Sequence, residues 1–220
     1  MGSVLRSKIL FNTRKALSYG DENASKRFFD DESDLAVFST AEKLAEKLAQ
    51  HKINYAFVGG FALNIHGFKR QTTDVDVLMN MEDLRKFQAD IVYNGFTPRF
   101  RDAKKSFRDP VSNVGIVIIV SGEFPGDGQP KDIQFPVPDN NNIMDIGGMK
   151  IINLPTLINL KLSSFKSLPQ RRMKDRTDVA GLVKNLSLGV TFADKLHNSV
   201  REEFLAVVEE VIAEEASKSE

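Results

Sequence analysis

The sequence predicts an α+β fold, in which a mixed β-sheet is flanked by helices and followed by a helical region at the C-terminus. Three observations support this prediction. An amphipathic helical pattern precedes the core, short strand patterns alternate with helices in the middle of the chain, and only helical patterns follow residue 153. Because 41% of the 220 residues are hydrophobic, the chain can bury the core of one large domain, or of one domain with a smaller appendage.

The first two regions are expected to be an N-terminal segment and the core. Residues 1–33 are expected to form a helix over 4–18 and an exposed acidic linker over 20–33. The core, expected over 34–153, opens with an amphipathic helix over 34–50, whose apolar side chains recur at spacings of three and four. The other elements expected in the core are strands over 54–58, 74–79 and 114–120, helices over 61–66 and 82–93, a loop-rich stretch over 122–138, and a hairpin with strands over 143–146 and 149–152.

The C-terminal helical region is expected over 154–220. Pro155 favours a helix start, because proline is preferred in the first turn, and this helix is expected to end near residue 164. Two further helices are expected over 171–185 and, approximately, over 194–216.

Composition limits the function. Lys plus Arg and Asp plus Glu each number 30, so the formal net charge is zero, which argues against binding nucleic acid by bulk electrostatics. The absence of cysteine excludes disulfides and thiolate metal sites and favours a reducing compartment. No segment approaches the roughly 20 apolar residues that span a bilayer. We therefore expect a soluble, cytoplasmic (intracellular) protein without a membrane partner.

The segment from residue 57 to residue 79 has the pattern expected of a catalytic site. A strand ends in Gly59 and Gly60, which allow close approach of a phosphate chain, and the N–H groups that begin the next helix favour anions. Asp74 and Asp76 alternate with valines on the following strand, so both carboxylates point to one face. Carboxylate oxygens suit Mg²⁺ or Mn²⁺, and two such ions assist phosphoryl-type transfer.

These residues resemble the nucleotidyltransferase superfamily of the DNA polymerase beta type, and look closest to AbiEii-type and related minimal nucleotidyltransferases. The resemblance implies a nucleotidyltransferase-type mixed sheet, binding of ATP or another NTP, and metal ligation by Asp74 and Asp76. It also implies nucleotide contacts from Gly59, Gly60, Arg70 and Thr73, although pairing of Arg70 with the aspartates is an equal alternative. The positions that match are Gly59, Gly60, Ala62, His66, Gly67, Arg70, Thr72, Asp74 and Asp76. For His66 itself, packing or capping is the preferred interpretation.

The later stretch LPTLINLKLSSFKSLPQRRMKDRTDVAGLV resembles the family's helix with an inward lysine, followed by Arg-x-x-Lys-Asp-x-x-Asp. The resemblance implies that Lys161 contacts the nucleotide phosphates and that Asp175 or Asp178 organises the site. The alternatives are a surface lysine, and two aspartates that pair with basic side chains of their own helix on a solvated face.

Family members normally carry a third carboxylate on the strand beside the Asp-x-Asp strand. The matching strand over 114–120 has no acid, and Ile118 is expected at the carboxylate position. Glu123 is the nearest replacement, with Asp127 and Asp132 as weaker candidates. Two interpretations follow: a transferase that moves an NMP from an NTP to an acceptor hydroxyl with two-metal assistance, or a degenerate protein that binds nucleotide or a partner. We favour the first, because loss of a general base typically costs about 10²- to 10⁴-fold without abolishing catalysis.

The acceptor stays open between RNA, a protein and a small molecule. The densest basic cluster is compatible with an RNA backbone, with a triphosphate, or with solubility alone; it consists of Lys161, Lys166, Arg171, Arg172, Lys174 and Arg176.

Overall fold

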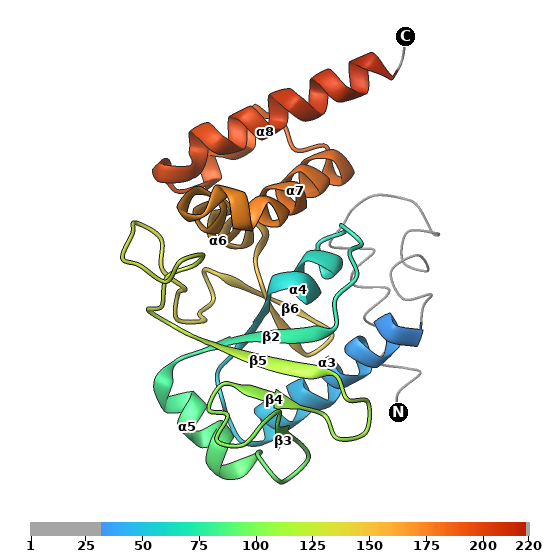
Figure 1. The fold of residues 1–220 in the computed structure, drawn as a ribbon, viewed down its shortest axis with the longest axis vertical. Helices are drawn as coiled ribbons and strands as arrows, with labels where there is room; N and C mark the ends of the chain where they lie inside the picture. Colours follow the sequence, from blue (N-terminus) through green and yellow to red (C-terminus); the bar gives the residue numbers. More distant parts are fainter. Residues whose placement is uncertain (1–31, 219–220) are drawn as a thin grey trace.

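The structure is a computed structural model that describes residues 32–218 (Figure 1). The helix expected over 4–18 and most of the acidic linker lie outside these residues. Helix α3 (Glu32–Gln50) opens the described part, so Glu32 and Ser33, expected in the linker, belong to this helix instead. None of the helices in the described part has the length and apolarity needed to cross a bilayer.

A seven-stranded mixed sheet forms the centre of the molecule, as the sequence predicts. Its strand order is β3-β4-β5-β2-β1-β7-β6. The pairs β2·β5 and β1·β7 are parallel and the other neighbours are antiparallel. The strands are β1 (Ala56–Val58), β2 (Asp74–Met79), β3 (Thr97–Pro98), β4 (Ser106–Arg108), β5 (Gly115–Val120), β6 (Ile143–Ile146) and β7 (Met149–Ile152).

Two short helices connect the strands of the core. Helix α4 (Gly59–Ile65) follows β1 directly, and α5 (Met81–Asp90) begins after Asn80, whose side chain accepts a hydrogen bond from the Asp83 N–H at 2.8 Å. Helix α4 lies nearer the C-terminal helices than α3 and α5 do (Figure 1), and its first turn contacts α3 through Phe61 and Phe38.

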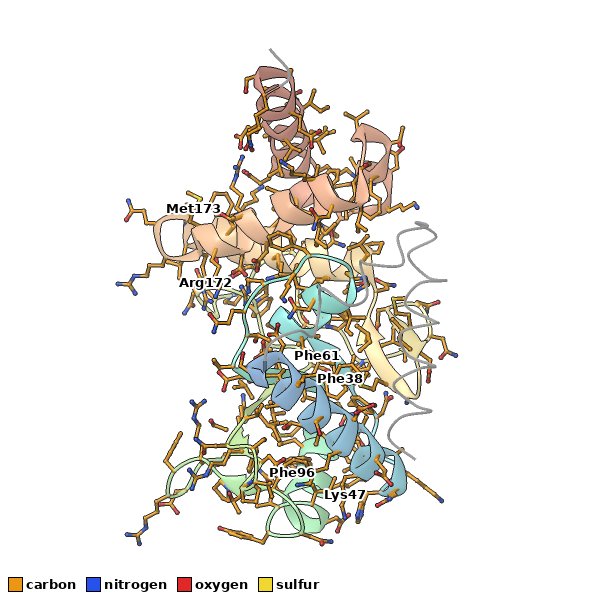
Figure 2. The ribbon with its side chains drawn as sticks, turned by 90° about the vertical axis from the view of Figure 1, so that its right-hand side faces the viewer. Phe38, Lys47, Phe61, Phe96, Arg172 and Met173 are labelled. Carbon is orange, nitrogen blue, oxygen red and sulfur yellow. The ribbon has the colours of Figure 1, made fainter. Side chains whose placement is uncertain are left out.

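Aromatic side chains fix the start of α4 against the sheet. The ring centroid of Phe61 lies 5.2 Å from that of Phe57 on β1 and 6.2 Å from that of Phe38 on α3. Figure 2 shows Phe38 and Phe61 turned toward one another between their helices. All three rings are buried. This packing holds the Gly59–Gly60 turn firmly at the end of β1.

The C-terminal region is helical, with one correction to the expected elements. It contains α6 (Leu154–Ser167), α7 (Pro169–Leu186), the 3-10 helix η1 (Val190–Lys195) and α8 (Asn198–Ser217). The last helix was expected to begin near Asp194. It begins at Asn198 because residues 190–195 form the separate 3-10 turn and His197 caps the next helix, its Nδ1 accepting from the Ser199 N–H at 3.3 Å.

Candidate active site

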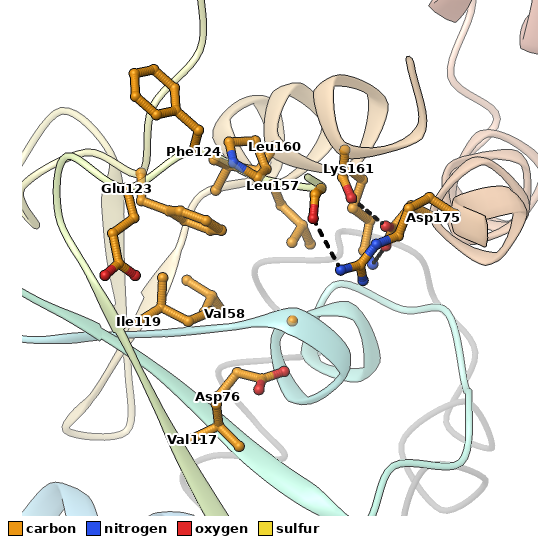
Figure 3. A pocket seen from close by; sticks show the side chains of 16 residues that line it. Val58, Asp76, Val117, Ile119, Glu123, Phe124, Leu157, Leu160, Lys161 and Asp175 are labelled. Atoms are coloured by element: carbon orange, nitrogen blue, oxygen red, sulfur yellow. Dashed lines mark hydrogen bonds and ion pairs between the residues drawn. The ribbon is translucent and has the colours of Figure 1, made fainter. Parts of the chain in front are cut away.

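A cavity of about 400 Å³ lies between the sheet, the loop after β5 and the first C-terminal helices (Figure 3). Asp76 lies on the sheet side of this cavity, and Lys161 and Asp175 lie on the helix side. Its full lining comprises Val58, Gly59, Asp76, Val117, Ile119, Glu123, Phe124, Pro125, Gly126, Phe135, Leu157, Leu160, Lys161, Ser164, Arg172 and Asp175. The cavity therefore brings together residues from both motifs that the sequence singled out.

The carboxylate of Asp76 lies against the glycine turn. Gly59 has a φ of +61°, which favours glycine, and a Cβ there would collide with Oδ2 of Asp76. The Gly60 N–H donates a hydrogen bond to the same carboxylate. The sequence predicted that the glycine turn allows close approach of a phosphate chain. In this structure the group that approaches the turn closely is the carboxylate of Asp76.

Burial, and to a smaller extent the charge of Asp74, raise the pKa of Asp76 to about 6. Lys161, the Gly60 N–H and Arg70 act in the opposite direction without cancelling these two effects. The neighbouring positive charges and the N–H donor therefore do not fully stabilise the ionised form of Asp76. A cation bound beside its carboxylate would stabilise that form.

Asp74 contacts an arginine that sequence reasoning did not single out. Arg99 Nη1 lies 3.1 Å from Oδ1 of Asp74, and both side chains are partly exposed. Gly115, opposite Asp74 in the register, makes this pair possible because a Cβ there would collide with the Asp74 carboxylate. Thr73 is exposed, with its Oγ1 3.5 Å from Oδ2 of Asp74, and it does not line the cavity.

The position beside the aspartates on β5 differs from the predicted one. Asp76 pairs with Val117 in the parallel register, so the two-residue period puts Val117 and Ile119 on the aspartate face. Ile118 pairs with Val77 and is buried on the opposite face of the sheet. The assignment of Ile118 to the third-carboxylate position was therefore wrong by one residue. The absence of an acid from this strand holds, and the neighbours of Asp76 on β5 are aliphatic.

Glu123 is the acid of the loop that lines the cavity. It forms an ion pair with Lys105, and its Oε2 accepts from the Val120 N–H at 3.4 Å. Asp127 pairs with Lys131, and neither Asp127 nor Asp132 lines this cavity. Of the three candidates for a replacement carboxylate, Glu123 alone has the required location.

Lys161 is buried, with 7% of its surface exposed, and it is not a surface lysine. Its Nζ donates to Oδ2 of Asp178 at 2.5 Å and to Oδ1 of Asp175 at 3.2 Å. Arg70 Nη1 donates to the same Oδ2 of Asp178 at 2.9 Å, and the Ser164 hydroxyl donates to Asp175 at 2.7 Å. The two aspartates thus pair with Lys161 and Arg70 instead of with basic residues of their own helix. Two cations and two carboxylates make this cluster electrically balanced.

Arg70 does not line the cavity and does not pair with Asp74 or Asp76 in this structure. Gly60 lets it pack against the turn, since a Cβ there would lie 2.8 Å from Arg70 Nη2. His66 packs as expected: its imidazole is buried and Nε2 donates to the Ile152 carbonyl at 2.7 Å. Burial lowers the pKa of His66.

The predicted basic cluster does not form one surface. Arg176 pairs with Glu203 and Glu210 at 2.7 and 2.6 Å, and Lys166 donates to the Ser199 carbonyl at 2.5 Å. With Lys161 buried as well, the exposed members are Arg171, Arg172 and Lys174 at the start of α7 together with Lys166. Among these, Arg172 lines the cavity.

The residues present suit one divalent cation. Asp74 and Asp76 share a face of β2, and Mg²⁺ is commonly held by one or two carboxylates together with substrate phosphates. No group of three acidic, histidine or cysteine side chains that would form an all-protein metal site occurs within residues 32–218. The aliphatic Val117 and Ile119 supply no ligand for a second ion.

Comparisons with known proteins bear on the fold. No protein-family model matches the sequence, and no curated protein matches it either. The crystal structure of ANT(2'')-Ia in complex with adenylyl-2''-tobramycin is similar over 76% of this chain and 96% of its own, with 11% identity and a TM-score of 0.50. The solution structure of the antibiotic-resistance factor ANT(2'')-Ia is similar over 86% and 98%, with 12% identity and a TM-score of 0.50. This chain has the nucleotidyltransferase fold.

An antigenic nucleotidyltransferase-like protein from Paracoccidioides brasiliensis is also similar, with 17% identity over 69% of this chain and 77% of its own, at a TM-score of 0.47. The likeness to AbiEii-type proteins stays a prediction from sequence. Within the nucleotidyltransferase fold, the elements from both sequence motifs surround one cavity: the glycine turn and Asp76 on the sheet side, and Lys161 with Asp175 on the helix side.

Proposed function

We propose that the protein binds a nucleoside triphosphate with Mg²⁺ (or Mn²⁺) and transfers the nucleoside monophosphate to an acceptor hydroxyl. The observation that carries this proposal is the position of Asp76. Its under-compensated carboxylate lies on the cavity between the glycine turn and Lys161. A metal–triphosphate complex offers a cation for Asp76 and oxyanions for the donors on the opposite side.

Asp74 and Asp76 are the proposed metal ligands. When bound, the cation neutralises charge on the phosphate oxygens and orients the reacting phosphate. The side chains support one ion more readily than the two expected from the family resemblance, because the adjacent β5 positions are aliphatic. A second ion would take its ligands from the nucleotide and the acceptor.

The triphosphate is proposed to extend from the glycine turn toward α6. The backbone N–H groups of Gly59 and Gly60 would face the triphosphate at this turn, where the Gly60 N–H donates to Asp76 in the structure. Lys161 has three N–H donors, and Asp175 and Asp178 take two of them. The third donor remains for a phosphate oxygen, while Arg70 positions Lys161 through their shared partner Asp178.

In the proposed transfer, the acceptor oxygen forms a bond to the α-phosphorus as the bond between that phosphorus and the bridging oxygen to the β-phosphate breaks. Pyrophosphate leaves, and the acceptor proton passes to Glu123. Glu123 lines the cavity on the side of β5 away from Lys161, so the acceptor would enter between this loop and the aliphatic side chains of Val117 and Ile119. RNA, a protein and a small molecule all remain open as acceptors.

Binding without turnover is the second candidate function. Two observations favour it: the aliphatic side chains beside Asp76 on β5, and the guanidinium of Arg99 against Asp74. In this case the fold would hold a nucleotide, or a partner, without catalysing transfer.

The first test is isothermal titration of each NTP, with and without Mg²⁺, into the wild type and the Asp74→Asn/Asp76→Asn variant. We expect metal-dependent binding that the double variant loses while remaining folded. Equal metal-dependent affinity in both proteins would refute the assignment of the two aspartates.

The second test separates transfer from binding alone. Pyrophosphate release from the NTP that binds is measured with RNA, protein and small-molecule acceptors. We expect Glu123→Gln to lower the rate by about 10²- to 10⁴-fold, as typical for loss of a general base. Asp127→Asn, which alters an acid of the same loop outside the cavity, is the matched control. Tight binding with no pyrophosphate release from any acceptor would favour the second candidate function.

A further inference from the structure

Helix α7 is interrupted at Arg172, at the mouth of the cavity. This residue has φ −115° and ψ 19°, outside the helical range, so that two helical segments meet there. The break lies one turn before Asp175, and both residues line the cavity. Arg171, the preceding residue, is also exposed to solvent and does not line the cavity.

Arg172 differs from the other cation of the cavity lining in its charge environment. Lys161 contacts two carboxylates. Within residues 32–218, Arg172 has no carboxylate within 4.0 Å, and its hydrogen bond goes to the Gly126 carbonyl at 3.3 Å. The cavity therefore contains one compensated cation and one cation whose charge no acidic side chain balances.

The loop that contacts Arg172 is itself held in place. Gly126 has a φ of +81° and packs so tightly on α6 that a Cβ would collide with Oγ of Ser167 and lie 2.8 Å from the Ser164 carbonyl. Lys131 donates to the adjacent Pro125 carbonyl at 2.7 Å. A fixed backbone carbonyl can orient a guanidinium without neutralising it, which leaves most of the five N–H donors of Arg172 for a ligand.

We propose that Arg172 binds the terminal phosphates of the nucleoside triphosphate and the pyrophosphate that leaves. The inference rests on the proposed function, because it requires the triphosphate to occupy this cavity. Asp76, a proposed metal ligand, lies on the sheet side of the cavity (Figure 3), and Arg172 lines the cavity from α7, so the chain of phosphates would run from sheet to helix. A guanidinium fork matches a pair of phosphate oxygens, whereas Lys161 has a single free N–H donor.

The experiment compares Arg172→Ala with Arg171→Ala, its matched control on the same exposed turn. The affinities for NTP, NDP and NMP of one base are measured by titration in Mg²⁺, and inorganic tripolyphosphate serves as a competitor lacking the nucleoside. We expect Arg172→Ala to weaken NTP and tripolyphosphate binding by about tenfold or more while changing NMP binding less than about twofold. Arg171→Ala should change none of these affinities by more than about twofold.

Four outcomes overturn the inference. Equal loss in both arginine variants would indicate general electrostatic attraction, and equal loss for NTP and NMP would move the contact away from the terminal phosphates. Unchanged NTP binding in Arg172→Ala, with binding still lost in the Asp74→Asn/Asp76→Asn variant, would refute the role of Arg172 and leave the proposed function intact. Absence of NTP binding to the wild type would overturn both. Arg172→Lys, which keeps the charge without the planar fork, should recover part of the affinity.

Discussion

The acidic side chains on the two sides of the cavity differ in how far neighbouring cations balance their charge. On the sheet side, Asp74 and Asp76 share one face of β2, and the residues opposite them on β5 are Gly115 and Val117. On the helix side, Asp175 and Asp178 share one face of α7 and enclose Lys161. Burial and the neighbouring charge of Asp74 raise the pKa of Asp76 in the first pair, whereas the second pair is balanced by two cations. We infer that the helix side is built for rigidity and that the sheet side is left to be completed by a ligand.

The same geometric rule produces both pairs. A strand brings every second residue to one face, and a helix brings residues three apart to one face. The periodicity of each element therefore places its two aspartates close together. The difference lies in what the neighbouring element supplies. Helix α6 supplies a lysine that reaches both carboxylates, and β5 supplies aliphatic side chains.

The largest expected effect comes from breaking the balanced side. Asp178→Ala should lower the free energy of unfolding by about 3–5 kcal/mol, because it leaves Lys161 and Arg70 without their shared, buried carboxylate. Urea denaturation at neutral pH measures this loss. Asp175→Ala is the control, and should cost less because the Asp175 side chain is 20% exposed. A loss below about 1 kcal/mol for Asp178→Ala would mean that the cluster contributes little to stability.

On the sheet side, removing the carboxylate of Asp76 is expected to raise the free energy of unfolding, the opposite of the effect of Asp178→Ala. An acid whose pKa is raised in the folded state keeps its proton up to a higher pH there than in the unfolded state. Wild-type stability should therefore fall as the pH rises from the ordinary aspartate value of about 4 through the Asp76 pKa of about 6. Without Mg²⁺, Asp76→Asn should remove this fall and stabilise the fold at pH 8 by about 3 kcal/mol relative to the wild type.

Urea denaturation between pH 4.5 and 8 checks this expectation. Asp74→Asn serves as the companion variant, because removing the Asp74 charge removes the second cause of the raised pKa and should reduce the slope without abolishing it. Identical pH profiles for wild type and Asp76→Asn would show that Asp76 is already compensated.

The sequence predicted the fold where a regular period ran through a whole element. The alternation of Asp74 to Met79 predicted β2 and the common face of its acids, and the hairpin strands β6 and β7 have the predicted bounds. Strands β3 and β4 carried no such signal, because they have only two and three residues, too few for a period to show. Ile118 was misplaced because a continuous apolar run does not say which of its residues face the cavity, and only the register with β2 decides that.

The sequence predicted site residues that belong to a motif within one element, but not the contacts between residues of different elements. The motif spacing identified Gly59 and Asp76, and the family resemblance identified Lys161; all three line the cavity. The spacing of three from Lys161 to Ser164 on one helix face was a signal that could have been used. Arg99 reaches Asp74 from 25 positions along the chain, and no local pattern links the two. The break in α7 at Arg172 likewise has no mark in a sequence stretch that reads as continuous helix.

The smallest expected effect concerns Arg99, the cation that pairs with Asp74 on the sheet side. The Arg99–Asp74 pair is partly exposed, and such pairs contribute about 1 kcal/mol or less, so Arg99→Ala should barely change stability. Because Arg99 competes with a metal for Asp74, its removal should raise the apparent Mg²⁺ affinity in the presence of NTP by up to about fivefold at low salt.

Magnesium titrations at constant NTP measure this change, and Arg101→Ala is the matched control, since Arg101 is exposed and contacts only the adjacent Asp102 at 3.8 Å among the ion pairs of the described residues. Weaker NTP binding in Arg99→Ala would show the reverse relation, with the arginine contacting the nucleotide and not competing with its metal. A gain in Mg²⁺ affinity instead would mean that Arg99 stands in for the cation at Asp74, so that the sheet side, like the helix side, is kept partly compensated until its ligand binds.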